Sequence, residues 1–110
     1  MTTPRPAERI RKRVPCDIRL RDARRSGMVL NLSRSGLFVQ TTVAAKPGED
    51  VELLLNAPQT RIAIPVNAQI VWNRVVNPQF RSVVQGGFGA RIRAASDDYY
   101  ELLRDYAPFD

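Results

Sequence analysis

The stretch RIAIPVNAQIVW, residues 61–72, alternates apolar and polar side chains almost without a break. A period of two residues is typical of a β-strand with one buried face. The residues of one parity are predicted to face a core: Ile62, Ile64, Val66, Ala68, Ile70 and Trp72. Arg61, Asn67 and Gln69 take the opposite, outward parity. Pro65 also falls outward, which indicates a strand edge or a bulge.

The same alternation recurs on both sides of this stretch. Cys16, Ile18 and Leu20 share the inward parity of a first strand, and residues 22–27 are polar and read as a hairpin turn. In the second strand, Met28, Leu30 and Leu32 are predicted to face inward, and Val29, Asn31 and Ser33 outward. Further strands are predicted at residues 37–41, 51–56 and 86–92, with Phe38, Trp72 and Phe88 as core aromatics.

The period changes near the C-terminus. Tyr99, Leu102, Leu103 and Tyr106 follow the i, i+3, i+4, i+7 spacing of one apolar helix stripe. Ser96 is predicted to cap this helix of about residues 96–106, and acidic residues 97 and 98 suit its positive end. Six short strands and one helix predict an all-β fold, a six-stranded antiparallel β-barrel with a C-terminal helix.

Positive charge is concentrated near the N-terminus. The 110 residues fit one domain, in which residues 1–13 are predicted to form a flexible basic arm and residues 14–110 the barrel with its helix. Residues 1–34 hold ten Lys/Arg against three acids, and residues 35–110 hold seven against eight. Lys12 and Lys46 are the only lysines. Since arginine binds phosphate through a planar fork and stacks on flat rings, the sequence predicts an anionic partner with aromatic faces.

Two short motifs stand beside the predicted strands. Arg9 and Arg13 form Arg-x-x-x-Arg just before the first strand, and residues 31–36, NLSRSG, form Asn-x-Ser-x-x-Gly at the end of the second. Together they resemble the paired signature of the PilZ domain family. Further landmarks of that family follow in order along residues 9–93: RVP at 13–15, SGLFV at 35–39, VW at 71–72 and GFGA at 87–90.

The resemblance implies a barrel that binds cyclic di-GMP as a ligand, not as a cofactor. The motif positions that it assigns to the ligand are Arg9, Arg13, Asn31, Ser33 and Gly36, with Arg34 and Arg91 as additional candidate contacts. The chemistry agrees, because two arginines on an arm can bind phosphate and stack on guanine, and an asparagine can both accept and donate hydrogen bonds. The resulting expectation is a cytoplasmic receptor or adaptor that changes its arm conformation on binding and signals to an unidentified downstream protein.

The composition disfavours several other classes of protein. With no histidine and the single Cys16, no metal site is expected, and the lack of catalytic equipment indicates that the chain is not an enzyme. No apolar run is long enough for membrane insertion, and the polar N-terminus resembles no secretory signal. Two alternatives remain: a PilZ-like adaptor without the nucleotide, and a small nucleic-acid-binding β-barrel. The second is disfavoured because no solvent-facing aromatic is predicted.

Overall fold

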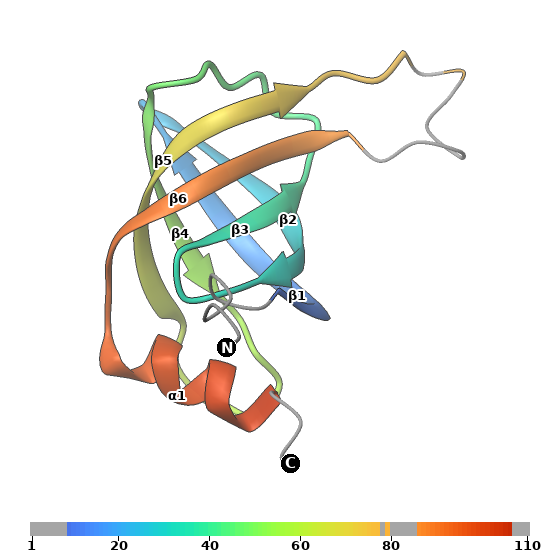
Figure 1. Cartoon of the computed structure of the whole chain (residues 1–110). Helices are drawn as coiled ribbons and strands as arrows, with labels where there is room; N and C mark the ends of the chain where they lie inside the picture. The colour runs from blue at the N-terminus through green and yellow to red at the C-terminus, as the bar shows by residue number, and fades with distance from the viewer. Residues whose placement is uncertain (1–8, 78, 80–85, 107–110) are drawn as a thin grey trace, which may run out of the picture.

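The computed structural model describes residues 9–77, 79 and 86–106, which form a closed β-barrel with one helix (Figure 1). The strands are β1 Ile10–Leu20, β2 Ala23–Leu32, β3 Gly36–Gln40, β4 Asp50–Leu55, β5 Ile64–Arg74 and β6 Gly87–Ala95. Neighbouring strands are antiparallel in the order β1-β2-β3-β6-β5-β4, and the barrel closes because β1 also pairs with β4. The predicted six-stranded antiparallel β-barrel with a C-terminal helix is confirmed.

The inward parity of each strand fills the barrel. Cys16, Ile18 and Leu20 of β1 are buried as predicted, and β5 contributes four further buried residues, Ile64, Val66, Ala68 and Ile70. Each large aliphatic side chain buried in this way stabilises the fold by about 1.5–3 kcal/mol. Burial also raises the pKa of the Cys16 thiol to about 12, so this thiol is a packing group.

A bulge in β2 changes which side chains face the core. The register of β2 against β3 shifts after Val29, so β2 has one additional residue between Val29 and Asn31. Against β1 the register shifts at the same place, but there the additional residue lies in β1, between Arg11 and Val14. Val29 is therefore fully buried, whereas Met28 and Leu30 are only half-buried. The prediction that Val29 faces outward was wrong, because strict alternation does not allow for a bulge.

A second bulge, between Ile70 and Trp72, turns the end of β5 outward. Val71 is 52% exposed and Trp72 is 42% exposed, although Trp72 was predicted to face the core. Ile62, also predicted inward, precedes β5 and is 72% exposed. Phe88 is a core residue as predicted, and Phe38 is buried without belonging to the main core cluster.

The first hairpin is tighter than the sequence predicts. Its turn is formed by Arg21 and Asp22, with Arg21 in the left-handed region at φ 57°, so most of residues 22–27 belong to β2. At the other end, β1 begins at Ile10, so residues 10–13 form part of the barrel wall. Of the arm predicted at 1–13, residues 1–8 lie outside the described residues.

Helix α1 spans Asp97–Tyr106 and lies against one end of the barrel (Figure 1). Tyr99, Leu102 and Leu103 form its buried face, at the predicted spacing. The predicted side-chain cap was wrong: the buried Ser96 hydroxyl has no hydrogen-bond partner within the described part of the chain, and the Ser96 carbonyl accepts from Tyr99 N instead. No helix in the described ranges is long and apolar enough to cross a membrane.

Candidate functional site

A row of directly paired residues crosses the outer wall of four strands. It runs from Asn31 on β2 through Phe38 on β3 and Gly89 on β6 to Trp72 on β5. Because paired residues present their side chains on one face, the Trp72 indole reaches across Gly89, where a Cβ would lie 2.3 Å from its Nε1. The indole stacks on Phe38, with ring centroids 5.2 Å apart and 16° between the planes. This stack explains how Phe38 is buried outside the main core.

A second row runs beside the first, from Gly36 on β3 through Arg91 on β6 to Gln69 on β5. Gly36 permits close approach of the backbones, since a Cβ there would lie 2.6 Å from the Ala90 carbonyl oxygen. Gly36 and Gly89, called here the glycine floor, underlie an open hollow of about 200 Å³. The residues that line this hollow are Arg9, Ser35, Gly36, Val71, Trp72, Gly89, Ala90 and Arg91. Ligand sites for drug-sized molecules measure about 300–1,000 Å³, so this hollow suits a single base.

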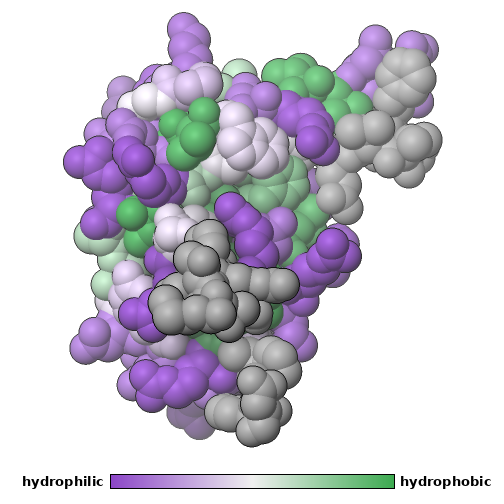
Figure 2. Space-filling model, viewed as in Figure 1, coloured by the Kyte–Doolittle hydropathy of each residue, from purple (hydrophilic) through white to green (hydrophobic). Residues whose placement is uncertain are grey.

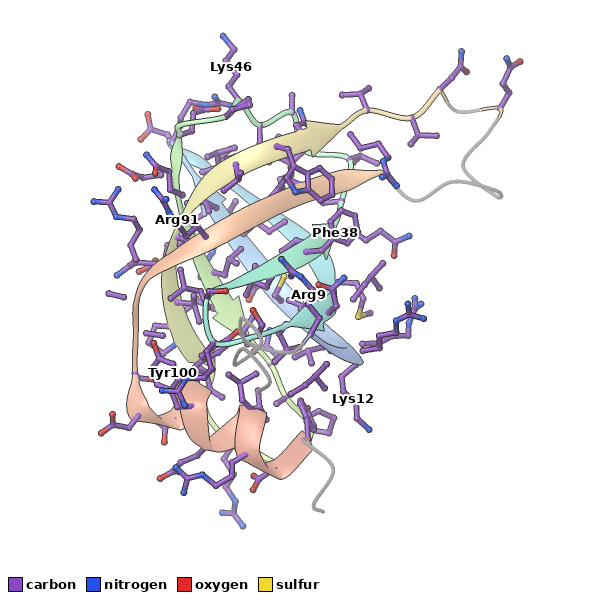
Figure 3. All side chains as sticks on the ribbon, in the orientation of Figure 1. Arg9, Lys12, Phe38, Lys46, Arg91 and Tyr100 are labelled. Atoms are coloured by element: carbon purple, nitrogen blue, oxygen red, sulfur yellow. The ribbon has the colours of Figure 1, made fainter. Side chains whose placement is uncertain are left out.

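The two sequence motifs meet at the edge of the hollow. Arg9 Nη1 donates a hydrogen bond of 2.7 Å to Asn31 Oδ1, although the two residues are 22 positions apart. Arg9 Nη2 lies 3.8 Å from the position that a Cβ of Gly36 would occupy. Figure 3 shows Arg9 and Arg91 on the same face of the barrel, and both line the hollow. The structure therefore brings Arg9, Asn31, Gly36 and Arg91 together.

Ser33 builds the turn of the second motif. Its side chain is 2% exposed, not outward-facing as predicted, because Ser33 follows the end of β2 at Leu32 and its hydroxyl points into the turn before β3. Ser33 Oγ accepts hydrogen bonds from the backbone N–H groups of Ser35 and Gly36, at 3.2 and 3.1 Å, and donates to the Gly36 carbonyl at 3.1 Å. Any effect of Ser33 on a ligand would therefore act through the shape of this turn.

Arg13 and Arg34 lie apart from Asn31. Arg13 has an exposed side chain in a bulge of β1 between Arg11 and Val14, and no described contact joins it to Asn31. The Arg34 guanidinium lies 5.5 Å from the centre of the Tyr100 ring of α1. The structure therefore assembles only part of the predicted set around the hollow.

Helix α1 is connected directly to the motif turn. Tyr99 OH donates a buried hydrogen bond of 2.7 Å to the Ser33 carbonyl. Burial raises the pKa of the Tyr99 hydroxyl far above its usual range, so it stays a protonated donor. A second link joins the helix to the first motif, since Lys12 Nζ lies 5.4 Å from the Tyr106 ring centre.

Tyr99→Phe is expected to lower the free energy of unfolding by about 1–2 kcal/mol, because the buried Ser33 carbonyl would lose its donor. Chemical denaturation measures this loss. Tyr106→Phe is the matched control: it removes a hydrogen bond of 3.3 Å to Gln59 at an exposed position, and we expect a change below about 0.5 kcal/mol. Equal losses in the two variants would contradict a special role for Tyr99.

Trp72, Val71, Gly89 and Gln69 were not predicted as site residues. Trp72 and Gly89 lie in sequence landmarks of the resemblance, but strict alternation assigned Trp72 to the core. Figure 2 shows this face as mainly hydrophilic with small apolar areas, consistent with the exposure of Val71 and Trp72. The described residues contain no group of three or more side chains that could hold a metal ion.

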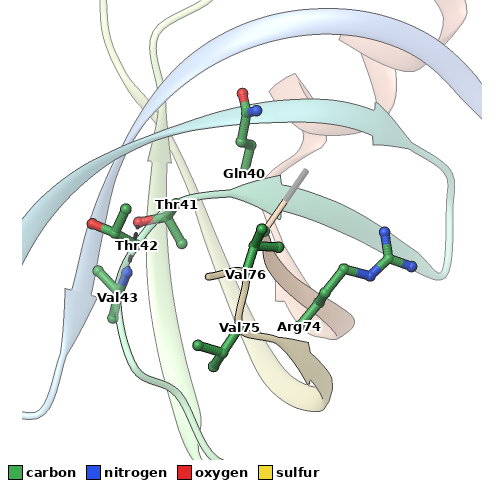
Figure 4. A pocket seen from close by; sticks show the side chains of 8 residues that line it. Gln40, Thr41, Thr42, Val43, Arg74, Val75 and Val76 are labelled. Carbon is green, nitrogen blue, oxygen red and sulfur yellow. Dashed lines mark hydrogen bonds between the residues drawn. The ribbon is translucent and has the colours of Figure 1, made fainter. Parts of the chain in front are cut away.

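Another hollow, of about 240 Å³, lies at the start of the connection after β5 (Figure 4). Apart from Arg74, whose guanidinium lies 5.7 Å from the Trp72 ring centre, its side chains are neutral. They belong mainly to threonine and valine: Thr41, Thr42, Val43, Val75 and Val76. Convergent polar groups fix a ligand's orientation, so the glycine-floored hollow is the better candidate for a nucleotide.

Comparison with known proteins gives one match to a family model and several similar solved structures. A family model described as the PilZ domain matches residues 3–107. The PilZ domain of YcgR from Escherichia coli, solved with c-di-GMP, is 17% identical with a TM-score of 0.65; the match covers 93% of this chain and 87% of that one. The Bacillus subtilis inhibitor of motility, MotI/DgrA, is 15% identical with a TM-score of 0.73 over 96% of this chain, which spans about half of that protein (50%). A search of curated proteins finds no match.

Proposed function

The chain belongs to the PilZ domain family, and from this premise we propose that it is a non-catalytic receptor domain for cyclic di-GMP. The family consists of receptor and adaptor domains, and the structurally similar domain of YcgR was solved with this nucleotide. The proposal extends that chemistry to the residues around the glycine floor.

One observation carries the proposal: the hydrogen bond from Arg9 Nη1 to Asn31 Oδ1 at the edge of the hollow. It brings the first arginine of Arg-x-x-x-Arg to the asparagine of Asn-x-Ser-x-x-Gly, over the glycine of the same motif. An arginine and an asparagine side by side offer a forked cation for phosphate and an amide for a guanine edge.

The ligand is proposed to bind with one guanine over the Gly36 side of the glycine floor, beside the indole that covers Gly89. Trp72 supplies an aromatic wall for stacking, and base stacking on an aromatic side chain contributes about 1–3 kcal/mol. Arg9 binds a phosphate and Asn31 a guanine edge. Arg13, exposed on β1, binds the second phosphate, and Ser33 holds the turn that presents Gly36.

Helix α1 is proposed to carry the signal. Arg34 and Lys12 lie within the two motifs, and each places its cation over a tyrosine of α1. A cation–π contact is worth about 0.5–1 kcal/mol at an exposed site, so a ligand that rearranges the two motifs breaks these contacts at little cost. Binding would thereby loosen α1 and alter the surface seen by an unidentified downstream protein in the cytoplasm.

Trp72 is the only tryptophan of the chain, so its fluorescence is a direct test. Titration with cyclic di-GMP is expected to quench the emission saturably, because a guanine stacked on the indole quenches it. Asn31→Ala should shift the curve to at least about tenfold higher ligand concentration, since an amide that makes two hydrogen bonds to a base is worth about 1–3 kcal/mol. Arg25→Ala, on the β1–β2 hairpin away from the hollow, is the control and should match wild type. Unchanged emission at saturating ligand would contradict the proposed stacking.

A nucleic-acid-binding barrel is the second candidate, because Trp72 is the exposed aromatic that the sequence did not predict. The two functions differ in their response to salt. Each phosphate contact of a nucleic acid adds to the slope of affinity against salt concentration, so binding of a strand falls steeply. A dinucleotide with two phosphates gives a shallow slope, and we expect the shallow slope here.

A further inference from the structure

Arg91 lies beside Gly36, the glycine of the Asn-x-Ser-x-x-Gly motif, on the neighbouring strand. The register pairs Arg91 of β6 with Gly36 of β3 on one side and with Gln69 of β5 on the other. Because Gly36 has no side chain, the wall next to Arg91 is open on the side of the hollow. Arg9 and Arg91 therefore form two cationic rims of one hollow (Figure 3).

Gln69 fixes the orientation of the Arg91 guanidinium. Arg91 Nη2 donates to Gln69 Oε1 at 3.1 Å, and Gln69 Nε2 donates to the Gly48 carbonyl at 3.2 Å. Gly48 is itself held against β5, since its N–H donates to the Ile70 carbonyl at 2.8 Å. This chain of hydrogen bonds holds the guanidinium in place before a ligand arrives, which lowers the entropy cost of binding.

On the premise of the proposed function, we propose that Arg91 reads the N7 and O6 edge of the guanine on the glycine floor, and that Gln69 is its positioning residue. A flat ring that lies over Gly36, beside the indole that covers Gly89, directs an edge toward Arg91, the residue paired with Gly36. The guanidinium fork donates two parallel hydrogen bonds to guanine O6 and N7. Adenine presents an amino donor in place of O6, so it loses one bond and meets a second donor. Arg91 thereby selects guanine over adenine.

The test removes one ligand atom and one side chain in turn. Cyclic di-GMP and its 7-deaza analogue, which carries C–H in place of N7, are titrated calorimetrically into wild type, Arg91→Ala and Arg93→Ala. We expect wild type to bind the analogue about tenfold more weakly than cyclic di-GMP, and Arg91→Ala to lose most of this difference as well as about tenfold of its affinity for the parent ligand. Arg93 lies two residues further along β6 and is exposed, so Arg93→Ala should behave as wild type.

Two more variants separate orientation from charge. Arg91→Lys keeps the charge without the fork and should discriminate as poorly as Arg91→Ala. Gln69→Leu keeps the arginine but frees it, so an intermediate loss of discrimination is expected. If Arg91→Ala and Arg91→Lys discriminate between the two ligands as well as wild type does, the inference about Arg91 is overturned and the proposed function stands. If wild type binds neither ligand, the proposed function itself fails.

Discussion

Replacing Arg9 with alanine is expected to lower the affinity for cyclic di-GMP by about 100-fold, because each hydrogen bond to a charged group contributes about 1.5–3 kcal/mol. The side chain is exposed and its described hydrogen bond is to Asn31, so the barrel should melt at nearly the wild-type temperature. Calorimetry gives the affinity and a thermal scan gives the stability. Arg9→Lys separates geometry from charge: it keeps the cation, loses the fork and should recover little of the binding.

Arg13 and Arg25 complete this test. Arg13→Lys is expected to lose most of the binding as well, because the second motif arginine also acts through its fork. Arg25→Ala should lose little, since Arg25 donates to its neighbour's carbonyl on the β1–β2 hairpin, away from the hollow. Similar losses from Arg9→Ala, Arg13→Lys and Arg25→Ala would indicate a diffuse electrostatic surface, as in the nucleic-acid alternative. Wild-type affinity in Arg9→Ala would refute the assignment of Arg9.

Gly89→Ala is expected to weaken ligand binding and to lower the stability of the barrel together. Its Cβ would lie 2.3 and 2.4 Å from indole atoms of Trp72, so the indole must leave its place over the floor. Phe38 then loses the indole that stacks on it, and overpacking of this kind lowers the free energy of unfolding by about 1–3 kcal/mol. We expect at least about tenfold weaker binding, since stacking on the indole is lost. A red-shifted tryptophan emission should accompany it, because the displaced ring enters water.

A double variant isolates the steric cause. Trp72→Ala alone removes the stacking wall and should also weaken binding. Adding Gly89→Ala to Trp72→Ala should then cost almost no further stability, because the colliding ring is gone. A full additional loss of 1–3 kcal/mol in the double variant would mean that Gly89 matters for some reason other than contact with Trp72.

The fold was predictable because strand alternation and helix spacing are local properties of the sequence. The inward residues of β1 and the buried stripe of α1 were identified correctly for this reason. The errors at Val29 and Trp72 come from bulges, which insert one residue and exchange the two faces of a strand. A bulge depends on pairing with a distant strand, so alternation within one segment does not reveal it.

The candidate site was predictable only in part, and for a related reason. The motifs identified Arg9, Asn31 and Gly36, which the structure brings together. The hollow itself comes from cross-strand pairing, in which Gly36 and Gly89 remove side chains from two adjacent rows. Long-range register of this kind cannot be read from spacing along the chain.

Calorimetric titration of the whole chain with cyclic di-GMP, alongside cyclic di-AMP, GTP and linear pGpG, tests the central claim most directly. The account predicts saturable binding of cyclic di-GMP, because the site reads both guanine and the paired phosphates, and far weaker binding of the other three. Comparable affinity for GTP would reveal a general phosphate site. The account is contradicted if protein that is folded by circular dichroism gives no heat of binding at several temperatures. The chain would then be an adaptor that has the barrel but does not bind the ligand.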